Sequence, residues 1–262
     1  MELKTQSNTE HRTLRVRYAS RRRTLAVLEK RHLTPRMLRV VLGGEDFEDF
    51  STPSADDHIK LYVPGAGGDL EARDFTPRHF DADAKQLTVD IALHAAGPAI
   101  RWAEQAQIGD AVTISGPRGS VMVADDFDWW LLVGDETALP SIGRRVEGLA
   151  KGVRAITLVA VNGPAEEQRF TTRADHEAIW VHRGPDEATR AQPVMEALQR
   201  IVLPRGDGFV WIAAEARVAR AARDHVLNIR RHPPRWLRAS GYWIEGRADA
   251  YDRLDSQKEI QP

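Results

Sequence analysis

Short runs of alternating apolar and polar residues fill the first half of the chain, and segments rich in glycine and proline separate them. Such runs predict β-strands. Five or six short strands between turns are typical of an antiparallel barrel. The predicted strands cover residues 24–29, 37–42, 58–63, 86–93 and 111–115.

The pattern changes after residue 125, where apolar runs begin to alternate with segments of helical period. The clearest predicted helix spans 215–231, because Val218, Ala222, Val226 and Ile229 recur at helical spacing. This alternation predicts βα units on a parallel sheet. The apolar runs lie at 129–133, 155–161, 178–181, 209–213 and 241–244, and the predicted organisation is a polar N-terminal arm over 1–22, a barrel domain over 23–125 and an α/β domain over 126–262.

Composition narrows the classes of function that the chain can serve. Lys and Arg number 37 against 38 Asp and Glu, so no overall charge favours nucleic acid. There is no apolar segment of membrane-spanning length, and the N-terminus lacks the apolar core of a signal peptide, so we expect no membrane insertion and a cytoplasmic location. The absence of cysteine excludes disulfides, thiolate-bound iron–sulfur clusters and a catalytic thiol. Any redox chemistry must therefore use a bound organic cofactor.

The nine histidines form no pair at helical i, i+4 spacing and no HExxH string. The chain itself is therefore predicted to hold no metal ion.

Residues 73–78, with the sequence RDFTPR, combine two guanidinium groups, an aromatic ring and a hydroxyl. Together these groups can bind a pyrophosphate, cover a flat heterocycle and hydrogen-bond its edge, as a flavin dinucleotide requires. In an extended strand Arg73 and Phe75 share one face. A charged surface strand that leads into a Thr-Pro turn has the same sequence, and the string alone favours that simpler interpretation.

Residues 94–103, HAAGPAIRWA, are predicted to end a strand and begin a short helix, with Pro98 in its first turn. Free backbone N–H groups at such a helix start can bind a pyrophosphate. His94 could contact the same cofactor, although a lone histidine at a strand end more often has a structural role.

Residues 134–140, GDETALP, follow a buried strand and open a helix, where an open α/β sheet binds nucleotides. The segment lacks the GxGxxG fingerprint of ordinary dinucleotide-binding domains. Asp135 and Glu136 either cap the helix or hydrogen-bond a nicotinamide cofactor.

Five segments resemble, in the same order, the siderophore-interacting proteins, which are FAD-dependent ferric-siderophore reductases related to ferredoxin reductases. The resemblance covers residues 23–247, and five ordered motifs are far more specific than any one of them. The segments are RDFTPR at 73–78, HAAGPAIRWA at 94–103, GDAVTISGPRGS at 109–120, LLVGDETALP at 131–140 and GYWIEG at 241–246.

The resemblance implies an N-terminal antiparallel Greek-key FAD-binding barrel followed by a parallel-sheet α/β domain that binds NAD(P)H, as in ferredoxin reductases. It also implies roles by position. Arg73, Asp74, Phe75, Thr76 and Arg78 would bind FAD, with Thr76 as the catalytic hydrogen-bond partner of the flavin N5; His94, Gly97, Pro98 and Ala99 would flank its pyrophosphate; Asp135, Glu136 and Thr137 would serve the nicotinamide; and Lys60, Arg247 and, more weakly, Arg144 would attract the siderophore.

The chain departs from the family pattern at two positions of the second motif, which usually reads HGxxGPAS. Ala95 and Ile100 replace the glycine and the serine. The isoleucine lacks a hydroxyl that could bind phosphate, so we expect a lower affinity for FAD than is usual in the family.

The implied activity is electron transfer from NAD(P)H through FAD to a ferric siderophore, with release of Fe(II), in a monomeric protein that a ferredoxin could also supply with electrons. A flavin is suited to this task because a nicotinamide gives up two electrons while ferric iron accepts one. Two alternatives stay open from the sequence. They are a general NAD(P)H:flavin reductase and a non-catalytic siderophore-binding protein without FAD.

Overall fold

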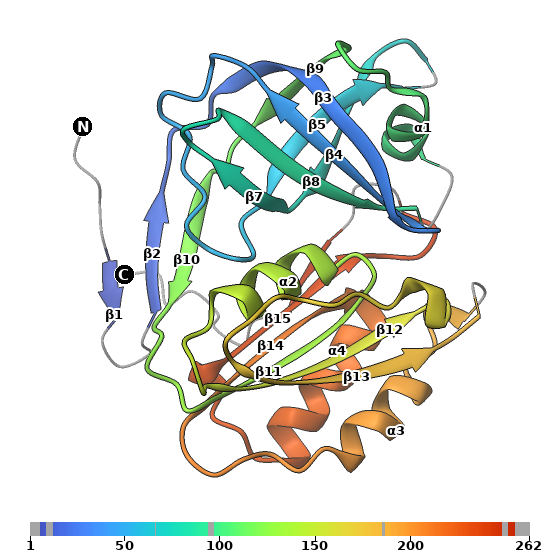
Figure 1. The fold of residues 1–262 in the computed structure, drawn as a ribbon. Helices are drawn as coiled ribbons and strands as arrows, with labels where there is room; N and C mark the ends of the chain where they lie inside the picture. Colours follow the sequence, from blue (N-terminus) through green and yellow to red (C-terminus); the bar gives the residue numbers. More distant parts are fainter. Residues whose placement is uncertain are drawn as a thin grey trace. The chain divides into compact units, whose positions relative to one another are not determined.

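The computed structural model of the chain describes residues 6–8, 13–65, 67–93, 97–184, 187–247 and 251–254. Contacts divide the chain into two compact units, Met1–Ala124 and Asp125–Pro262. Each unit has its own sheet and its own core, which Figure 1 shows as ribbons.

The first unit is built on a curved, seven-stranded antiparallel sheet, in agreement with the predicted barrel architecture. The last of its strands in the sequence, β9, pairs between β3 and β5, which is a Greek-key type of connection. The sheet order is β6-β5-β9-β3-β4-β8-β7, with β3 (Arg22–Thr34), β4 (Met37–Gly43), β5 (Ile59–Pro64), β6 (Leu70–Phe75), β7 (Pro77–Asp81), β8 (Gln86–Ala92) and β9 (Ala111–Ser115).

Strand β5 illustrates how the sequence pattern builds this unit. Ile59, Leu61 and Val63 alternate along it and are at most 1% exposed, whereas Lys60 and Tyr62 between them are only partly buried. This period of two directs one set of side chains into the core and the other away from it.

A separate three-stranded sheet joins the start of the chain to the end of the first unit. It consists of β1 (Gln6–Asn8), β2 (Thr13–Arg17) and β10 (Gly119–Val123), all antiparallel. Part of the predicted polar arm is therefore a strand. Gly119 permits the pairing, because a Cβ there would lie 2.4 Å from the backbone oxygen of Val16.

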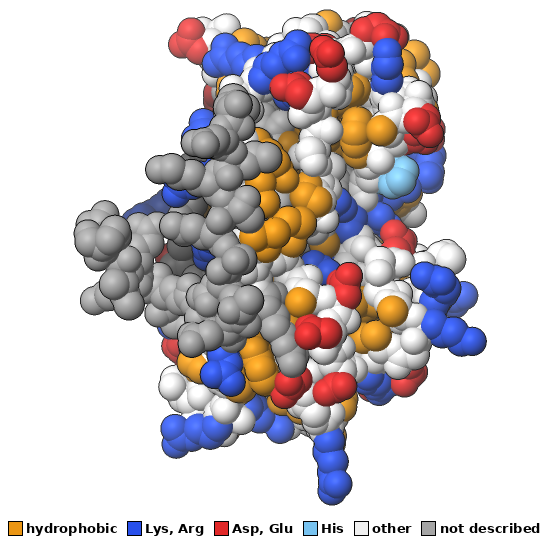
Figure 2. Space-filling view, turned by 90° about the vertical axis from the view of Figure 1, so that its left-hand side faces the viewer, with side chains coloured by type: hydrophobic (Ala, Val, Ile, Leu, Met, Phe, Trp, Pro, Cys, Tyr) orange, Lys and Arg blue, Asp and Glu red, His pale blue; other side chains and the backbone are white. Residues whose placement is uncertain are grey.

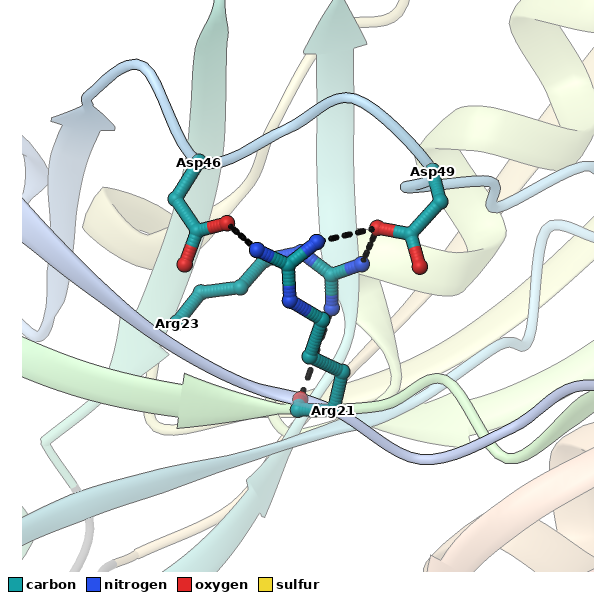
Figure 3. A network of polar contacts seen from close by, with 4 residues as sticks. All are labelled: Arg21, Arg23, Asp46 and Asp49. Carbon is teal, nitrogen blue, oxygen red and sulfur yellow. Dashed lines mark hydrogen bonds and ion pairs between the residues drawn. The ribbon is translucent and has the colours of Figure 1, made fainter.

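Arg21, just before β3, and Arg23, at its start, anchor the loop that follows β4 (Figure 3). Arg23 is 3% exposed and donates to the Asp49 carboxylate, and Arg21 Nη1 donates to the same oxygen at 3.2 Å. Arg21 also pairs with Asp46. Desolvation favours the neutral form of Asp49, but the hydrogen bond and charge of Arg23 outweigh it and hold the pKa of this carboxyl below its ordinary value.

The second unit contains the parallel sheet that the sequence predicts. Its order reverses between β11 and β14, which is the switch point where open α/β sheets bind ligands. The sheet runs β13-β12-β11-β14-β15-β16, with β11 (Trp129–Asp135), β12 (Arg154–Val161), β13 (Asp175–His182), β14 (Gly208–Glu215) and β15 (Leu237–Trp243) parallel and the short β16 (Asp252–Arg253) antiparallel.

Helices cover both faces of this sheet, with α2 (Leu139–Gly148) on one face and α3 (Gln192–Arg200) and α4 (Ala216–Asp224) on the other (Figure 1). The sequence predicts one long helix over 215–231. Instead, α4 ends at Asp224 and continues as a π-helical turn from His225 to Ile229. Every residue of β11 and β14 is buried, as expected for strands covered on both faces.

Burial lowers the pKa of His176, His225 and His232 below the ordinary value of 6.5. The positive charges of Arg154 and Arg230 add to the effect on His176 and His225, respectively. At His232 the carbonyl of Trp236 acts in the opposite direction, since it accepts a hydrogen bond from Nε2 at 3.0 Å.

These histidines predict a loss of stability in mild acid. A histidine with a lowered pKa in the folded state contributes its full stability above the unfolded value near 6.5, and this contribution falls as the pH drops below that value, because the unfolded chain binds the proton more readily. Each group can contribute a slope of up to about 1.4 kcal/mol per pH unit. Urea unfolding at pH 7.5 and 5.5 should show this fall, and a smaller fall in His232→Gln. Equal slopes in the two proteins would contradict the role of His232.

Candidate functional site

Residues 73–75 of the RDFTPR segment form the end of strand β6. The pairing of β6 with β5 fixes the face of the sheet on which each of these side chains lies. Arg73 lies opposite Leu61, and Phe75 lies opposite Ile59. Directly paired residues share a face of the sheet, so Arg73 and Phe75 are both on the face of the buried residues of β5. Phe75 packs against the core of the unit. Asp74 lies on the other face, opposite Lys60.

Arg73 is held in place but keeps donor capacity. Its Nη1 donates to the carbonyl of Ala72 at 2.8 Å, and its Nη2 donates to Glu71 Oε2 at 2.5 Å. A guanidinium has five N–H donors, and these bonds to described residues use two of them. The side chain is 21% exposed, so the remaining donors can serve a phosphate. Thr76, which directly follows β6, is buried, with 7% of its surface exposed.

Arg78 at the start of β7 belongs to a buried charge cluster that the sequence analysis did not identify. Its Nε lies 3.7 Å from Asp90 Oδ2, and Arg39 donates to both oxygens of the same carboxylate at 2.7 and 2.8 Å. The Asp90 side chain is 2% exposed. The sequence contains one signal for this cluster, because Asp90 is the single charged residue in the apolar run 86–93. In the sheet Asp90 pairs in register with Arg39.

The second motif forms the start of helix α1 (Pro98–Gln105), as predicted from the sequence. Gly97 is its N-cap in extended backbone, Pro98 lies in its first turn and no side chain caps it. A Cβ on Gly97 would meet no atom within 4 Å, so there is open space beside the helix start. Ala99 is buried, and His94 and Ala95 lie outside the described residues.

These residues fit the demands of FAD. The first unit offers a partly exposed guanidinium, an aromatic ring on the same face and an uncapped helix start with open space beside it. Helix α1 packs against β5 and β8, and β5 is the neighbour of β6. An anion at a helix start and a phosphate on an arginine are both favourable placements for a pyrophosphate.

In the second unit, Asp135 lies at the end of β11, at the switch point of the sheet, and is 3% exposed. Its Oδ1 accepts hydrogen bonds from the backbone N–H and the hydroxyl of Thr137 at 2.9 and 2.6 Å. Its Oδ2 accepts from the backbone N–H of Glu215 at 2.8 Å and from the indole N–H of Trp243 at 2.9 Å. One carboxylate thus joins the carboxyl ends of β11, β14 and β15.

Glu136 pairs with Arg183, which directly follows β13 at the edge of the sheet. Arg183 Nη2 donates to Glu136 Oε2 at 2.5 Å, and the two side chains are 2% and 13% exposed. The backbone N–H of Arg183 donates to the carbonyl of Val161 at 2.9 Å, which fixes the arginine beside the end of β12. The sequence analysis did not identify Arg183, because only the order of strands brings it near Glu136.

Glu215, which the sequence analysis also missed, ends β14 and directly precedes α4. It is fully buried, and its Oε2 accepts the backbone N–H of Arg217 at 2.7 Å, so that it caps α4. Gly134 allows the close packing at this point, because a Cβ there would lie 2.6 Å from the Cβ of Ala138 and 2.9 Å from the carbonyl oxygen of Ala213.

The basic residues predicted for the siderophore belong to both units. Lys60 Nζ lies 3.1 Å from Asp74 Oδ2, and these side chains are 27% and 34% exposed. Arg144 lies on α2 and is partly buried, and Arg247 follows the C-terminal motif and is exposed. Basic and acidic side chains are interspersed on the face that Figure 2 shows, in line with the net charge of -1.

Among the residues that the structure describes, no helix is long and apolar enough to cross a membrane. The same residues contain no group of three or more His, Asp or Glu side chains that could hold a metal ion.

Two family models match the chain. The model described as siderophore-interacting protein matches residues 127–246, and the model described as siderophore-interacting FAD-binding domain matches residues 26–72 and 68–121.

Individual proteins match over nearly the whole length. The NADPH-dependent ferric-chelate reductase of Escherichia coli is 31% identical over 90% of this chain and 98% of that protein. The ferric vibriobactin reductase of Vibrio cholerae is 26% identical over 86% of this chain and 90% of that protein. The crystal structure of a siderophore utilization protein from T. fusca superimposes with a TM-score of 0.85 at 32% identity and covers 91% of this chain and 98% of that one.

The four bonds to Asp135 predict a large effect of its removal on stability. Asp135→Ala leaves the indole N–H of Trp243 and the backbone N–H of Glu215 without their acceptor, and we expect a loss of about 2–4 kcal/mol in the free energy of unfolding, measured with urea. The matched control is Asp128→Ala, which removes an exposed carboxylate that accepts one backbone N–H, from Asp207 at 2.8 Å. Its expected cost is below about 1 kcal/mol, and equal losses in the two variants would contradict the network.

Proposed function

Because the chain belongs to the siderophore-interacting protein family, as its ordered motifs predict, we propose that it is an FAD-dependent reductase that passes electrons from NAD(P)H to ferric siderophores. The family relationship and the likeness to ferric-chelate reductases over nearly the whole chain support this activity. The single observation that carries it is the end of β6, where a partly exposed arginine and an aromatic ring share one face and a buried threonine follows.

We infer that FAD is held in the first unit, over residues 23–125. Arg73 binds the pyrophosphate, Phe75 covers the flavin ring and Asp74 contributes its backbone between them. Arg78 adds positive charge from the cluster with Asp90. The start of α1 binds the pyrophosphate through the backbone N–H groups of Gly97 and Ala99, while Pro98 shapes the first turn and His94 flanks the site.

The chemistry of the substrate explains the need for this cofactor. Ferric iron is held strongly by hard oxygen donors, and ferrous iron is held much less strongly by the same ligands. When bound, FAD would supply the conversion from two-electron to one-electron transfer, so that one NAD(P)H would reduce two ferric chelates and release one proton. We assign the hydrogen bond to the flavin N5 to Thr76, whose side chain is buried.

We infer that the nicotinamide is bound in the second unit, over residues 126–262, at the end of β11. Thr137 and Glu136 are the residues that contact it. Asp135 acts by fixing Thr137 and the start of the following helix, because its two oxygens already accept four hydrogen bonds. Arg183 orients Glu136 in turn.

We further propose that the protein works as a monomer in the cytoplasm, and that a reduced ferredoxin is an alternative donor of electrons. Lys60, Arg144 and Arg247 are the residues proposed to attract the siderophore. Charges opposite in sign to the substrate act mainly by raising the rate of its association. We therefore expect these three residues to raise kcat/KM for an anionic siderophore, and we expect this effect to weaken as the salt concentration rises.

The first test is the flavin itself. The purified protein should be yellow and carry FAD, and Arg73→Ala should weaken FAD binding by roughly 10- to 100-fold, because it removes a charge-assisted phosphate contact worth about 1.5–3 kcal/mol. Flavin fluorescence titration of the apoprotein measures the change. Arg31→Ala is the control, since Arg31 forms an exposed ion pair with Glu29 at 2.8 Å on β3. Unchanged FAD affinity in Arg73→Ala/Arg78→Ala would remove this assignment.

The second test concerns the donor. Glu136→Gln and Thr137→Val should slow the reduction of bound FAD by NAD(P)H by about 10-fold or more, the cost of one or two lost hydrogen bonds, while FAD stays bound. Stopped-flow absorbance of the flavin is the readout, with Glu196→Gln on α3 as the control. If both nicotinamides fail to reduce the wild-type flavin and reduced ferredoxin succeeds, the nicotinamide site is wrong and the flavin site stands.

The third test separates this activity from its alternatives. A siderophore reductase should reduce a ferric chelate faster than it releases reduced free flavin. Steady turnover of added flavin with no faster reduction of ferric chelates would indicate a general flavin reductase. A protein that binds a ferric siderophore but no FAD would be a carrier without catalysis.

A further inference from the structure

The face of β5 that points away from the core carries a cluster of charged and hydroxyl side chains from four neighbouring strands. Lys60 pairs in register with Asp74 of β6 and with Ser115 of β9, and Arg22 of β3 pairs with the same serine. Paired residues share a face, so these side chains gather together. We call this group, with Tyr62 on the same strand as Lys60, the outer-face cluster.

Direct contacts hold the cluster together. Lys60 Nζ donates to Asp74 Oδ2 at 3.1 Å, and the hydroxyl groups of Tyr62 and Ser115 lie 3.1 Å apart. The guanidinium of Arg22 lies 4.6 Å from the centre of the Tyr62 ring. The hydrogen bond with Ser115 lowers the pKa of Tyr62 against the opposing effect of burial, and the positive charges of Arg22 and Lys60 lower it further. The cluster therefore favours negative charge.

Asp74 reduces this attraction. Arg22 and Lys60 contribute two positive charges and Asp74 removes one, because its carboxylate lies within ion-pair distance of Lys60. A chelate that approaches Lys60 thus meets a carboxylate at the same place. For each negative charge on the chelate the attraction of Lys60 is offset by the repulsion of Asp74.

The position of Asp74 links the cluster to the flavin residues. It lies between Arg73 and Phe75 on one strand, where successive residues are about 3.3 Å apart and point to opposite faces. The outer-face cluster and the groups proposed to hold FAD therefore lie on opposite faces of β6, which is an edge strand of the sheet.

We propose that the outer-face cluster receives the ferric chelate and that Asp74, through its ion pair with Lys60, weakens the preference of the cluster for highly anionic chelates. This inference rests on the proposed reductase activity. The class of substrate that Asp74 admits is the neutral or singly charged ferric complex, such as a hydroxamate complex, which competes better with the trianionic tris-catecholate than it would at the same cluster without Asp74.

The experiment measures the second half-reaction by itself. Holoenzyme reduced with dithionite is mixed without oxygen with ferric tris-acetohydroxamate, which is neutral, or ferric tris-catecholate, a trianion, and flavin reoxidation is followed by stopped flow. The readout is the ratio of the rate constants for the trianion and the neutral chelate, because changes common to both chelates cancel. At low ionic strength Asp74→Asn should raise this ratio on the order of 10-fold, and high salt should reduce the gain.

Two further variants identify the ion pair as the cause. Lys60→Met should lower the ratio on the order of 10-fold, and Lys60→Met/Asp74→Asn should bring it back to within about 2-fold of wild type, because one charge of each sign is removed. Glu45→Gln is the matched control, since it removes an exposed carboxylate that pairs with Lys85 elsewhere in the same unit. It should leave the ratio unchanged.

An unchanged ratio in Asp74→Asn that still holds FAD, or an equal rise in Glu45→Gln, would overturn the inference. If Asp74→Asn loses FAD, the test rests on Lys60→Met. A ratio of rate constants in Lys60→Met equal to that of the wild type would then refute the role of the ion pair. A wild-type flavoprotein that reduces neither chelate would instead refute the proposed function.

Discussion

Alternation of side chains between the two faces of β5 and β6 is the constraint on which the first unit depends. A strand has a side-chain period of two, so a fixed register decides for every residue whether it meets the core or the opposite face. The pairs Ile59 with Phe75 and Leu61 with Arg73 place Arg73 and Phe75, which are proposed to bind the flavin, on the core side. The pair Lys60 with Asp74 then has to lie on the other side. A shift of one residue would exchange the two sets, and the apolar side chains of β5 make such a shift costly.

In the second unit one buried carboxylate has a comparable role. Asp135 accepts four hydrogen bonds from three segments that are far apart in the sequence, and thereby fixes the ends of β11, β14 and β15 at the point where ligands bind in this kind of sheet. An unpaired carboxylate at the end of β11 would repel the phosphate groups of a cofactor. Its negative charge is already engaged by protein donors, which reduces that conflict.

Buried charges recur at both candidate sites, and each is paired. Asp90 binds Arg39 and approaches Arg78, and Arg183 binds Glu136. Desolvation makes such pairs poor sources of stability, since an apolar pair of the same size is often as stable. Their value lies in geometry, because a guanidinium held by a carboxylate presents its other donors in one direction.

The sequence by itself determined the two architectures and, through its ordered motifs, the family. The period of two before residue 125 and the alternation of strands and helices after it are local patterns, and burial enforces them directly, so the antiparallel and parallel sheets follow from the chain. The start of α1 was likewise predicted from Pro98, because the fixed backbone angle of proline is a local property. The π-helical end of α4 was missed, since His225 to Ile229 continue a helical pattern whose local preference does not distinguish the two kinds of helix.

Only the tertiary structure decided which charges act together. Arg183 is 47 residues from Glu136, Arg39 is 51 residues from Asp90, and Trp243 is 108 residues from Asp135. Likewise, the sequence offered Lys60 as a basic residue, and the register alone gave it Asp74 as a partner. Such pairs depend on strand order and register, which many distant contacts set jointly, whereas a sequence pattern reports only on neighbours within a few residues.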